Sequence, residues 1–312
     1  MLRSAVVGLG PIGTTHATCL EQLEGVELAC VVDADDSRMQ TRKVGLGAMA
    51  LTDVEALPDD IDMVTVAVPP AAHYRLVEAL LKRGFHVFCE KPLALKLAEA
   101  KALAALAQRQ QRLLGVGFKM RYEPWFAKAR ELIERIGPPY QVITTKVQAF
   151  GGKDWVTTTG AMQELSSHDF DLIHHIAGVR PRRMLSAHLS HRRGWPAEDG
   201  FSLLVEYDSG MLGSLNGWYC DSFAWDGRDN TMRFIGPQGY LSIDRFERVV
   251  VHTDSEEVFS FEGAPNTFLL ELQAFVRAIE TGSTDYPDAA AGIDSLWVVE
   301  EAYKTAPVIS GL

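Results

Sequence analysis

The sequence predicts an α/β protein in two parts: an N-terminal Rossmann domain with a parallel sheet, then an α+β domain with a mostly antiparallel, open sheet. Three observations favour this fold. The 312 residues are long for a single core and suit two. The first 117 residues alternate short apolar runs with longer helical patterns, as a parallel sheet covered on both faces requires. After Gly117, strand patterns follow one another across turns. We expect domains at 1–120 and 121–312.

The elements of this fold can be placed along the chain in order. In the first domain the expected strands are 4–8, 28–33, 63–68, 86–89 and 113–116, and the expected helices are 14–23, 71–83 and 95–111. In the second domain, helix 124–135 and a helix over 160–178 accompany strands 140–150, 201–207, 211–217, 231–235, 240–244 and 248–252. Helices 265–281 and 288–305 close the chain.

Composition excludes several classes of function. The net charge is -11, from 30 Lys and Arg against 41 Asp and Glu, which argues against nucleic acid as a partner. The short basic runs at 180–183 and 191–193 are expected to be solvated surface. The four cysteines lack Cys-x-x-Cys spacing, so no structural zinc site or disulfide framework is indicated. No apolar stretch approaches a membrane span. These features favour a cytoplasmic protein without a membrane partner.

The sequence Gly8-Leu9-Gly10-Pro11-Ile12-Gly13 lies between an apolar strand and a helix. In this G-x-G-x-x-G turn the glycines permit the tight bend, the approach of a pyrophosphate and close packing of helix on strand. Asp33 ends the second strand 20 residues after Gly13, where a carboxylate can bind the adenosine ribose hydroxyls. The acid favours NAD, whereas Arg38 could accommodate a 2′-phosphate, so NADP stays open. We predict a dinucleotide site that includes Pro11, Ile12 and Arg38.

The chemistry is expected where strands end, because ligands of open parallel sheets bind at the carboxyl ends of the strands. Pro69 and His73 follow one strand, and Glu90 and Lys91 follow the next. A lysine at a strand end is commonly a solvated charge. Near a nicotinamide, its ammonium could instead bind a substrate hydroxyl and stabilise the developing alkoxide. We therefore predict cofactor contacts for these four residues and a catalytic role for Lys91.

A second candidate group lies on the helix expected over 160–178. At helical spacing Glu164, His168, Asp171 and His175 share one face beside an apolar face. His168 could take the hydroxyl proton, and Glu164 could fix its tautomer. The simpler alternative is a surface Glu/His pair, and a metal site is disfavoured because His174 points away from the others. Asp169 falls among the apolar positions, where it could face the other domain or a buried arginine.

The order of these motifs resembles the Gfo/Idh/MocA family of dehydrogenases. The resemblance rests on GLGPIGTTH, VVDAD, VAVPPAAHYRLVEALLKRGFHVFCEKPLA, GFKMRYEP, QELSSHDFD and NTMRFIGPQGYLSID, and it covers nearly the whole chain. It implies that Lys91 is the lysine of the EKP motif and that His168 is the acid/base. It also implies oligomers formed through the C-terminal sheet, as a homodimer or homotetramer. Two departures are Glu164, where family members usually have Asp, and the single Gly160.

The sequence thus predicts an NAD(P)-dependent oxidoreductase that transfers a hydride between nicotinamide and a secondary hydroxyl or keto group of a sugar, sugar derivative or cyclitol. Arg121, Tyr122 and Trp155 are candidates to line the polyol pocket together with Lys91, Glu164 and His168. Two alternatives stay open: a dinucleotide-sensing regulator without catalysis, and an NAD-recycling hydrolase or epimerase. No bound metal is expected. The substrate itself depends on pocket shape, which the residues alone do not reveal.

Overall fold

The computed structural model describes residues 1–41, 44, 47–152, 154–221, 228–244, 247–263 and 265–307. The chain forms two compact units. The first comprises Met1–Lys119 and Asn266–Ile293, and the second Met120–Pro265 and Asp294–Leu312. The first unit is therefore discontinuous in sequence.

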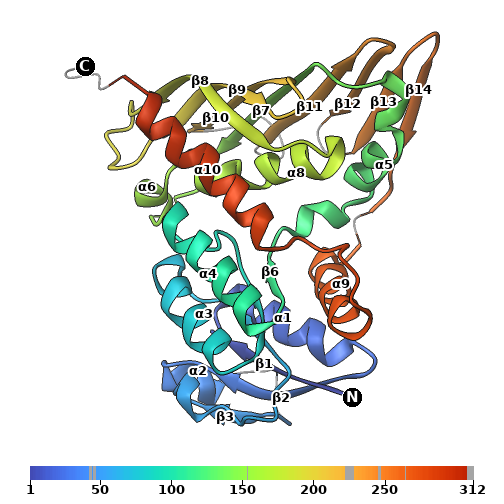
Figure 1. Ribbon diagram of the computed structural model, residues 1–312. Helices are drawn as coiled ribbons and strands as arrows, with labels where there is room; N and C mark the ends of the chain where they lie inside the picture. The colour runs from blue at the N-terminus through green and yellow to red at the C-terminus, as the bar shows by residue number, and fades with distance from the viewer. Residues whose placement is uncertain are drawn as a thin grey trace. The chain divides into compact units, whose positions relative to one another are not determined.

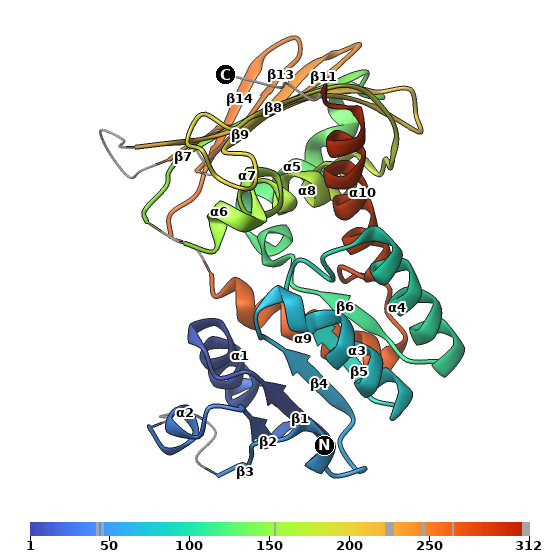
Figure 2. The ribbon, with the colours of Figure 1, turned by 90° about the vertical axis from the view of Figure 1, so that its left-hand side faces the viewer.

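The first unit is built on a parallel six-stranded sheet in the order β3-β2-β1-β4-β5-β6. Helices α3 and α4 pack together on one face, and α1 and α9 pack together on the other (Figures 1 and 2). The strands are apolar because both faces are covered. Their bounds are β1 Leu2–Val7, β2 Val26–Val32, β3 Met49–Leu51, β4 Met63–Val66, β5 His86–Cys89 and β6 Leu114–Val116. The helices are α1 Pro11–Gln22, α2 Asp36–Thr41, α3 His73–Lys82, α4 Leu97–Gln110 and α9 Thr267–Thr281.

Helix α9 completes the core of this unit although it follows the last strand of the second unit. Its apolar residues Leu272, Phe275 and Val276 belong to the same buried cluster as Val6 and Phe88. The rings of Phe88 and Phe275 lie 5.5 Å apart. The first 119 residues thus lack part of the core that their own strands require.

The second unit is an eight-stranded sheet in the order β14-β13-β12-β11-β7-β10-β9-β8. Its pairs are antiparallel except for β7 and β10, which run parallel. Figures 1 and 2 show α5, α8 and α10 on one face of this sheet. The strands are β7 Gln141–Ala149, β8 Pro181–Ser190, β9 Gly200–Tyr207, β10 Leu212–Cys220, β11 Arg228–Gly236, β12 Gly239–Asp244, β13 Arg248–His252 and β14 Glu256–Ser260. The helices are α5 Pro124–Leu132, α6 Val156–Thr159, α7 Ala161–Leu165, α8 Ser167–Ala177 and the part of α10 (Ala289–Thr305) that begins at Asp294.

The predicted fold class is confirmed, and the individual helices and strands differ from the expected ones only locally. The helix expected over 160–178 is divided, because Ser166 has φ -118° and ψ 5° and interrupts the run between α7 and α8. Strand β8 was not expected, since it is an edge strand in which half of the residues are exposed and burial shows little alternation. Helix α2 and strands β3 and β14 were not expected either, and each is short or largely exposed.

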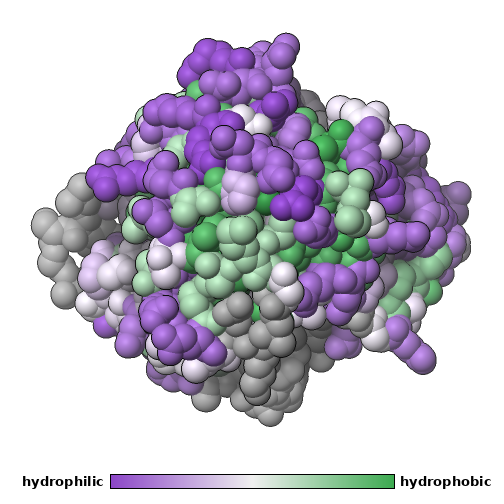
Figure 3. Space-filling model, turned by 90° about the horizontal axis from the view of Figure 1, so that it is seen from below, coloured by the Kyte–Doolittle hydropathy of each residue, from purple (hydrophilic) through white to green (hydrophobic). Residues whose placement is uncertain are grey.

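Hydrophilic residues predominate on the face of the molecule in Figure 3, around a smaller hydrophobic area. The basic run at 180–183 includes Arg183, whose exposed side chain forms an ion pair with Glu206 on the neighbouring strand. This agrees with the solvated role expected for it. Across the described ranges, no helix combines the length and hydrophobicity needed to cross a bilayer.

Candidate functional site

The glycine turn connects β1 to α1, and each glycine has its own reason to be there. Gly8 has φ +94°, and a Cβ on it would lie 2.5 Å from the carbonyl oxygen of Ala67. A Cβ on Gly13 would lie 1.7 Å from the oxygen of Gly8, so only glycine lets α1 approach the turn. A Cβ on Gly10 would meet no described atom within 4 Å. The space beside Gly10 is therefore open, and an incoming group can approach the backbone there.

This open space meets the start of α1. Gly10 is the N-cap and Pro11 is the first helical residue, which suits a proline because that position needs no N–H. The first N–H groups of a helix have no acceptor within it, and they carry partial positive charge. The open face at Gly10 and these donors fit the pyrophosphate of a dinucleotide.

Asp33 follows β2 and is only 8% exposed. One carboxylate oxygen accepts a hydrogen bond from the backbone N–H of Leu9 at 2.6 Å, and the other accepts from Asp35 N–H at 2.9 Å. The Arg38 guanidinium lies 3.5 Å from the same carboxylate. Asp33 is thus fixed against the glycine turn, in the position predicted for a ribose-binding acid.

Lys91 lies in the loop after β5, and its backbone is held on both sides. The Glu90 carboxylate accepts a hydrogen bond from Lys91 N–H at 3.1 Å. On the other side, His73 Nδ1 lies 2.7 Å from the carbonyl oxygen of Pro92, and its Nε2 lies 2.9 Å from that of Val68. Burial lowers the pKa of His73. The predicted cofactor contact of His73 lacks support, because the side chain is fully buried and joins two loops.

Glu164 and His168, the predicted proton-transfer pair, lie in the second unit on consecutive helices, α7 and α8. Both are partly exposed. The start of α7 is fixed by buried Glu198, whose carboxylate accepts a hydrogen bond from Met162 N–H at 2.7 Å and also bonds to the Tyr303 hydroxyl. A Cβ on Gly160 would lie 2.3 Å from Glu198, which explains the glycine there.

Asp171, which was predicted to share a polar face with Glu164 and His168, is engaged inside the unit. Asp171 is 2% exposed and forms two hydrogen bonds with Arg121, one of them at 2.8 Å. This leaves the predicted substrate contact of Arg121 without support in the geometry. Burial, aided by the charges of Arg121 and Arg130, lowers the pKa of His175 to about 2.

Asp169 is buried and pairs with Lys146 of β7, with Nζ 2.9 Å from Oδ1. The side-chain exposures are 7% for Lys146 and 5% for Asp169. A buried basic partner was one of the two expectations for Asp169, although the partner is a lysine and not an arginine. Burial raises the pKa of Asp169 against the opposing influence of Lys146.

Aromatic residues near α7 form a group that the sequence analysis missed. Trp195 packs on Phe150 with ring centroids 4.5 Å apart and on Tyr219 at 5.9 Å. Burial, together with the charges of Glu164 and Glu198, raises the pKa of Tyr219, so its phenol stays neutral. The predicted pocket residue Trp155 is 56% exposed, and Tyr122 is half-buried in the short helix 119–122. In the sequence, only the tryptophan in Gly-Trp-Pro at 194–196 pointed to this aromatic group.

Comparison with known proteins places both units in one family. Residues 2–118 match the model of an oxidoreductase family with an NAD-binding Rossmann fold, and residues 130–307 match its C-terminal alpha/beta domain. Together the two matches span most of the chain.

Two relatives are similar along almost their whole length. The chain is 29% identical to the myo-inositol 2-dehydrogenase of Thermotoga maritima, over 94% of this chain and 92% of the relative. It is 33% identical to a myo-inositol dehydrogenase of Streptomyces leeuwenhoekii, over 92% and 90%. Among solved structures, GenD2 from gentamicin A biosynthesis, in complex with NAD, superposes with a TM-score of 0.81 at 25% identity, over 98% of this chain and 94% of that one.

Proposed function

Because the chain belongs to the Gfo/Idh/MocA oxidoreductase family, whose first domain binds NAD, we propose that it oxidises a secondary hydroxyl of a cyclitol or a related sugar. The observation that carries this proposal is the fixed turn at Glu90-Lys91, which follows β5 of the NAD-binding sheet and offers an ammonium group. The named activity of relatives that are similar over nine-tenths of the chain supports the substrate class.

The glycine turn and Asp33 would hold NAD, which would supply the acceptor for the hydride on the carbon that carries the hydroxyl. Lys91 donates a hydrogen bond to the substrate oxygen and stabilises the negative charge that develops on it. His168 removes the hydroxyl proton, since an imidazole changes protonation state near neutral pH. Glu164 orients His168 and stabilises the imidazolium form. Glu164 has one methylene more than the aspartate usual in the family, and it lies one helix before His168.

The proposed ring substrate is myo-inositol or another cyclitol, with sugar derivatives as the wider class. Both relatives quoted above bear the name of an inositol dehydrogenase. A polyol ring needs several hydrogen-bonding groups beside apolar or aromatic surface. The Trp195 and Tyr219 rings beside α7 offer such a surface, so we add both to Trp155 and Tyr122 as proposed pocket residues.

The experiment that tests the function is a screen for reduction of NAD and of NADP. The substrates are inositol isomers, open-chain polyols, aldoses and nucleotide sugars. We expect turnover with NAD and a cyclitol, and weaker turnover with NADP. Tight NAD binding without reduction across the whole panel would instead favour a sensor. Cofactor that stays bound through purification and is not consumed would favour the recycling alternative.

A His168→Asn variant tests the proton-transfer role separately from substrate choice. The neutral limb of the pH dependence of kcat/KM should flatten, because asparagine does not titrate. If the variant keeps the shape of the wild-type profile, His168 is not the titrating group.

We also propose a homo-oligomer and a cytoplasmic location. The eight-stranded sheet has α5, α8 and α10 on one of its faces (Figure 2), and Leu185, Leu204 and Leu212 on β8, β9 and β10 are exposed. Light scattering of the purified protein at several concentrations would measure the oligomer. All four cysteines are free thiols, which supports a reducing compartment.

A further inference from the structure

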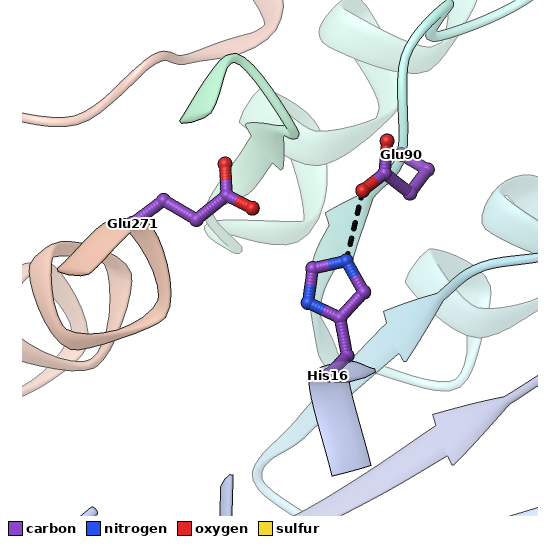
Figure 4. Close-up of side chains that lie close together, drawn as sticks. All are labelled: His16, Glu90 and Glu271. Atoms are coloured by element: carbon purple, nitrogen blue, oxygen red, sulfur yellow. Dashed lines mark hydrogen bonds and ion pairs between the residues drawn. The ribbon is translucent and has the colours of Figure 1, made fainter. Parts of the chain in front are cut away.

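Three ionisable side chains meet inside the first unit, behind the turn that carries Lys91. His16 comes from α1, Glu90 follows β5, and Glu271 comes from α9 (Figure 4). Their nearest nitrogen and oxygen atoms all lie within 4.8 Å of one another. His16 and Glu271 are fully buried, and the side chain of Glu90 is 14% exposed.

The two carboxyl groups of this cluster differ sharply in their partners. Glu90 Oε1 lies 2.9 Å from His16 Nε2, and Glu90 Oε2 accepts the hydrogen bond from Lys91 N–H. Neither oxygen of Glu271 has a hydrogen-bond partner among the described residues. Figure 4 shows the Glu271 carboxyl group directed toward His16 and Glu90.

The surroundings favour one charge on the two acids and not two. The His16 ring packs edge-on against Phe88 and Phe268, with centroids 5.8 and 5.3 Å away. Two carboxylates this close in an apolar setting do not both ionise readily. Burial and the nearby Glu90 charge raise the pKa of Glu271, while His16 and Lys91 hold the pKa of Glu90 low.

We propose that Glu271 is held as a neutral carboxylic acid that, with His16, orients the Glu90 carboxylate and so acts as a positioning residue for Lys91. Glu90 is the ionised member, and it fixes the backbone at the lysine that the proposed function uses. Gly117 leaves room for this arrangement, since a Cβ there would lie 3.0 Å from the Glu90 carboxyl group. The effect of Glu271 on turnover rests on the proposed dehydrogenase activity, whereas its protonation does not.

Several other charged and titratable groups act on the cluster. His16 and Cys19 face it from α1, Cys89 and Lys91 from the end of β5, and Lys119 from the segment after β6. The Lys119 ammonium lies 4.9 Å from the Phe268 ring centroid and acts electrostatically on Glu271. His16 and Lys91 lower the pKa of Glu90, whereas Lys119 opposes the rise in the pKa of Glu271 without reversing it.

The protonation of Glu271 can be measured without any enzyme activity. The infrared difference spectrum between wild type and Glu271→Gln at neutral pH should contain the carbonyl stretch of a protonated carboxylic acid. The matched control is Glu280→Gln, at an exposed position of the same helix, which should show only carboxylate bands. A carboxylate signal assigned to Glu271 at neutral pH would overturn the proposal.

Kinetics of two substitutions test the positioning role. Glu271→Gln keeps a neutral polar group of the same shape, so kcat/KM and its pH profile should stay within about threefold of wild type. Glu271→Leu removes the polar group and should lower kcat by about 10- to 100-fold through a displaced Lys91, with the NAD dissociation constant nearly unchanged. Equal losses in both variants, or no loss in the leucine variant, would contradict the positioning role.

Two further outcomes separate the possible failures. If Glu271→Leu does not fold, the infrared result and the Glu271→Gln kinetics still decide the proposal. If wild type binds a divalent metal ion in stoichiometric amount and Glu271→Gln does not, the cluster is a metal site, and the proposal of a neutral Glu271 is wrong. If no polyol is oxidised by wild type, the proposed function fails while the infrared result still tests the protonation of Glu271.

Discussion

Lys146 on β7 and Asp169 on α8 form an ion pair at 2.9 Å inside the second unit, with both side chains almost completely buried. The pair joins the sheet to the helix that also carries His168. We expect the pair to affect the free energy of unfolding, because replacing either residue leaves the other as an unpaired buried charge.

Lys146→Met or Asp169→Leu alone should each lower the free energy of unfolding by about 3 to 5 kcal/mol. The double variant should recover much of the loss, since it leaves no buried charge. Chemical denaturation of the four proteins measures the coupling. Arg183→Met, which breaks an exposed pair with Glu206, is the control and should cost about 0 to 1 kcal/mol. Strictly additive losses in the double variant would contradict the pairing.

His175 should make the protein less stable in mild acid. Burial lowers its pKa in the folded state to about 2, whereas in the unfolded chain the pKa is about 6.5. Between these values the unfolded state binds one more proton, so the free energy of unfolding falls as pH falls below about 6.5, by up to about 1.4 kcal/mol per pH unit. His175→Gln should have a shallower slope from pH 7 to pH 5. His188→Gln, at an exposed site on β8, should keep the wild-type slope.

Substitutions of two glycines should separate folding from cofactor binding. Gly10→Ala adds a Cβ into open space, so the melting temperature should stay close to wild type while NAD affinity falls about 10- to 100-fold by obstruction. Gly13→Ala places its Cβ 1.7 Å from a backbone oxygen and should destabilise the unit itself. Thermal melting and NAD titration of both variants give the comparison. Unchanged NAD affinity in Gly10→Ala would show that the dinucleotide does not approach there.

Asp33 should determine the choice between NAD and NADP. In Asp33→Ser the acid that repels a 2′-phosphate is gone, and Arg38 is available to bind that phosphate. The ratio of kcat/KM for NADP to that for NAD should rise by about tenfold or more, because one charged hydrogen-bond acceptor is lost for NAD. Asp36→Ser, on the exposed start of α2, should leave the ratio unchanged. If kcat/KM falls equally for NAD and NADP, Asp33 only stabilises the glycine turn through its hydrogen bond with Leu9.

Lys91→Ala should bind NAD with near wild-type affinity and lose most of its turnover. The backbone contacts that fix the turn come from Glu90 and His73, so they do not depend on the lysine side chain. Removing a group that stabilises developing negative charge typically lowers kcat by about 100- to 1,000-fold. Lys96→Ala, at an exposed position before α4, controls for loss of a positive charge. Wild-type turnover in Lys91→Ala would exclude the assigned role.

The parts of the fold that the residues predict are those with local patterns. Gly8, Gly10 and Gly13 predict the turn because their spacing falls within six residues, although only Gly13 answers a steric need inside the turn itself, where a Cβ would meet the oxygen of Gly8. Asp169 could not be assigned, because its partner Lys146 lies on a strand whose register depends on the whole sheet. The break at Ser166 was missed for a related reason. The apolar spacing continues through it, while the backbone changes direction there.

The residues alone could not show which of the predicted site residues are engaged within the protein. Lys91 and His168 keep their proposed roles, but Arg121 and His73 are engaged within the protein. A polar residue near a strand end or on a helix has the same sequence pattern whether it contacts a ligand or another part of the protein. Only packing distinguishes a ligand contact from an internal one. Glu271 illustrates the limit, since it is one of two glutamates in an otherwise ordinary amphipathic helix far along the chain.

Because α9 belongs to the first unit but is encoded late in the chain, the first unit cannot finish folding early in synthesis. The NAD-binding unit cannot close its core until Leu272, Phe275 and Val276 have been synthesised, more than 150 residues after its last strand begins. At 5 to 20 residues per second, its apolar surface stays uncovered for about 10 to 30 seconds. The sheet of the second unit is synthesised within that interval. Chaperone demand during translation should therefore be greatest for the half that comes first.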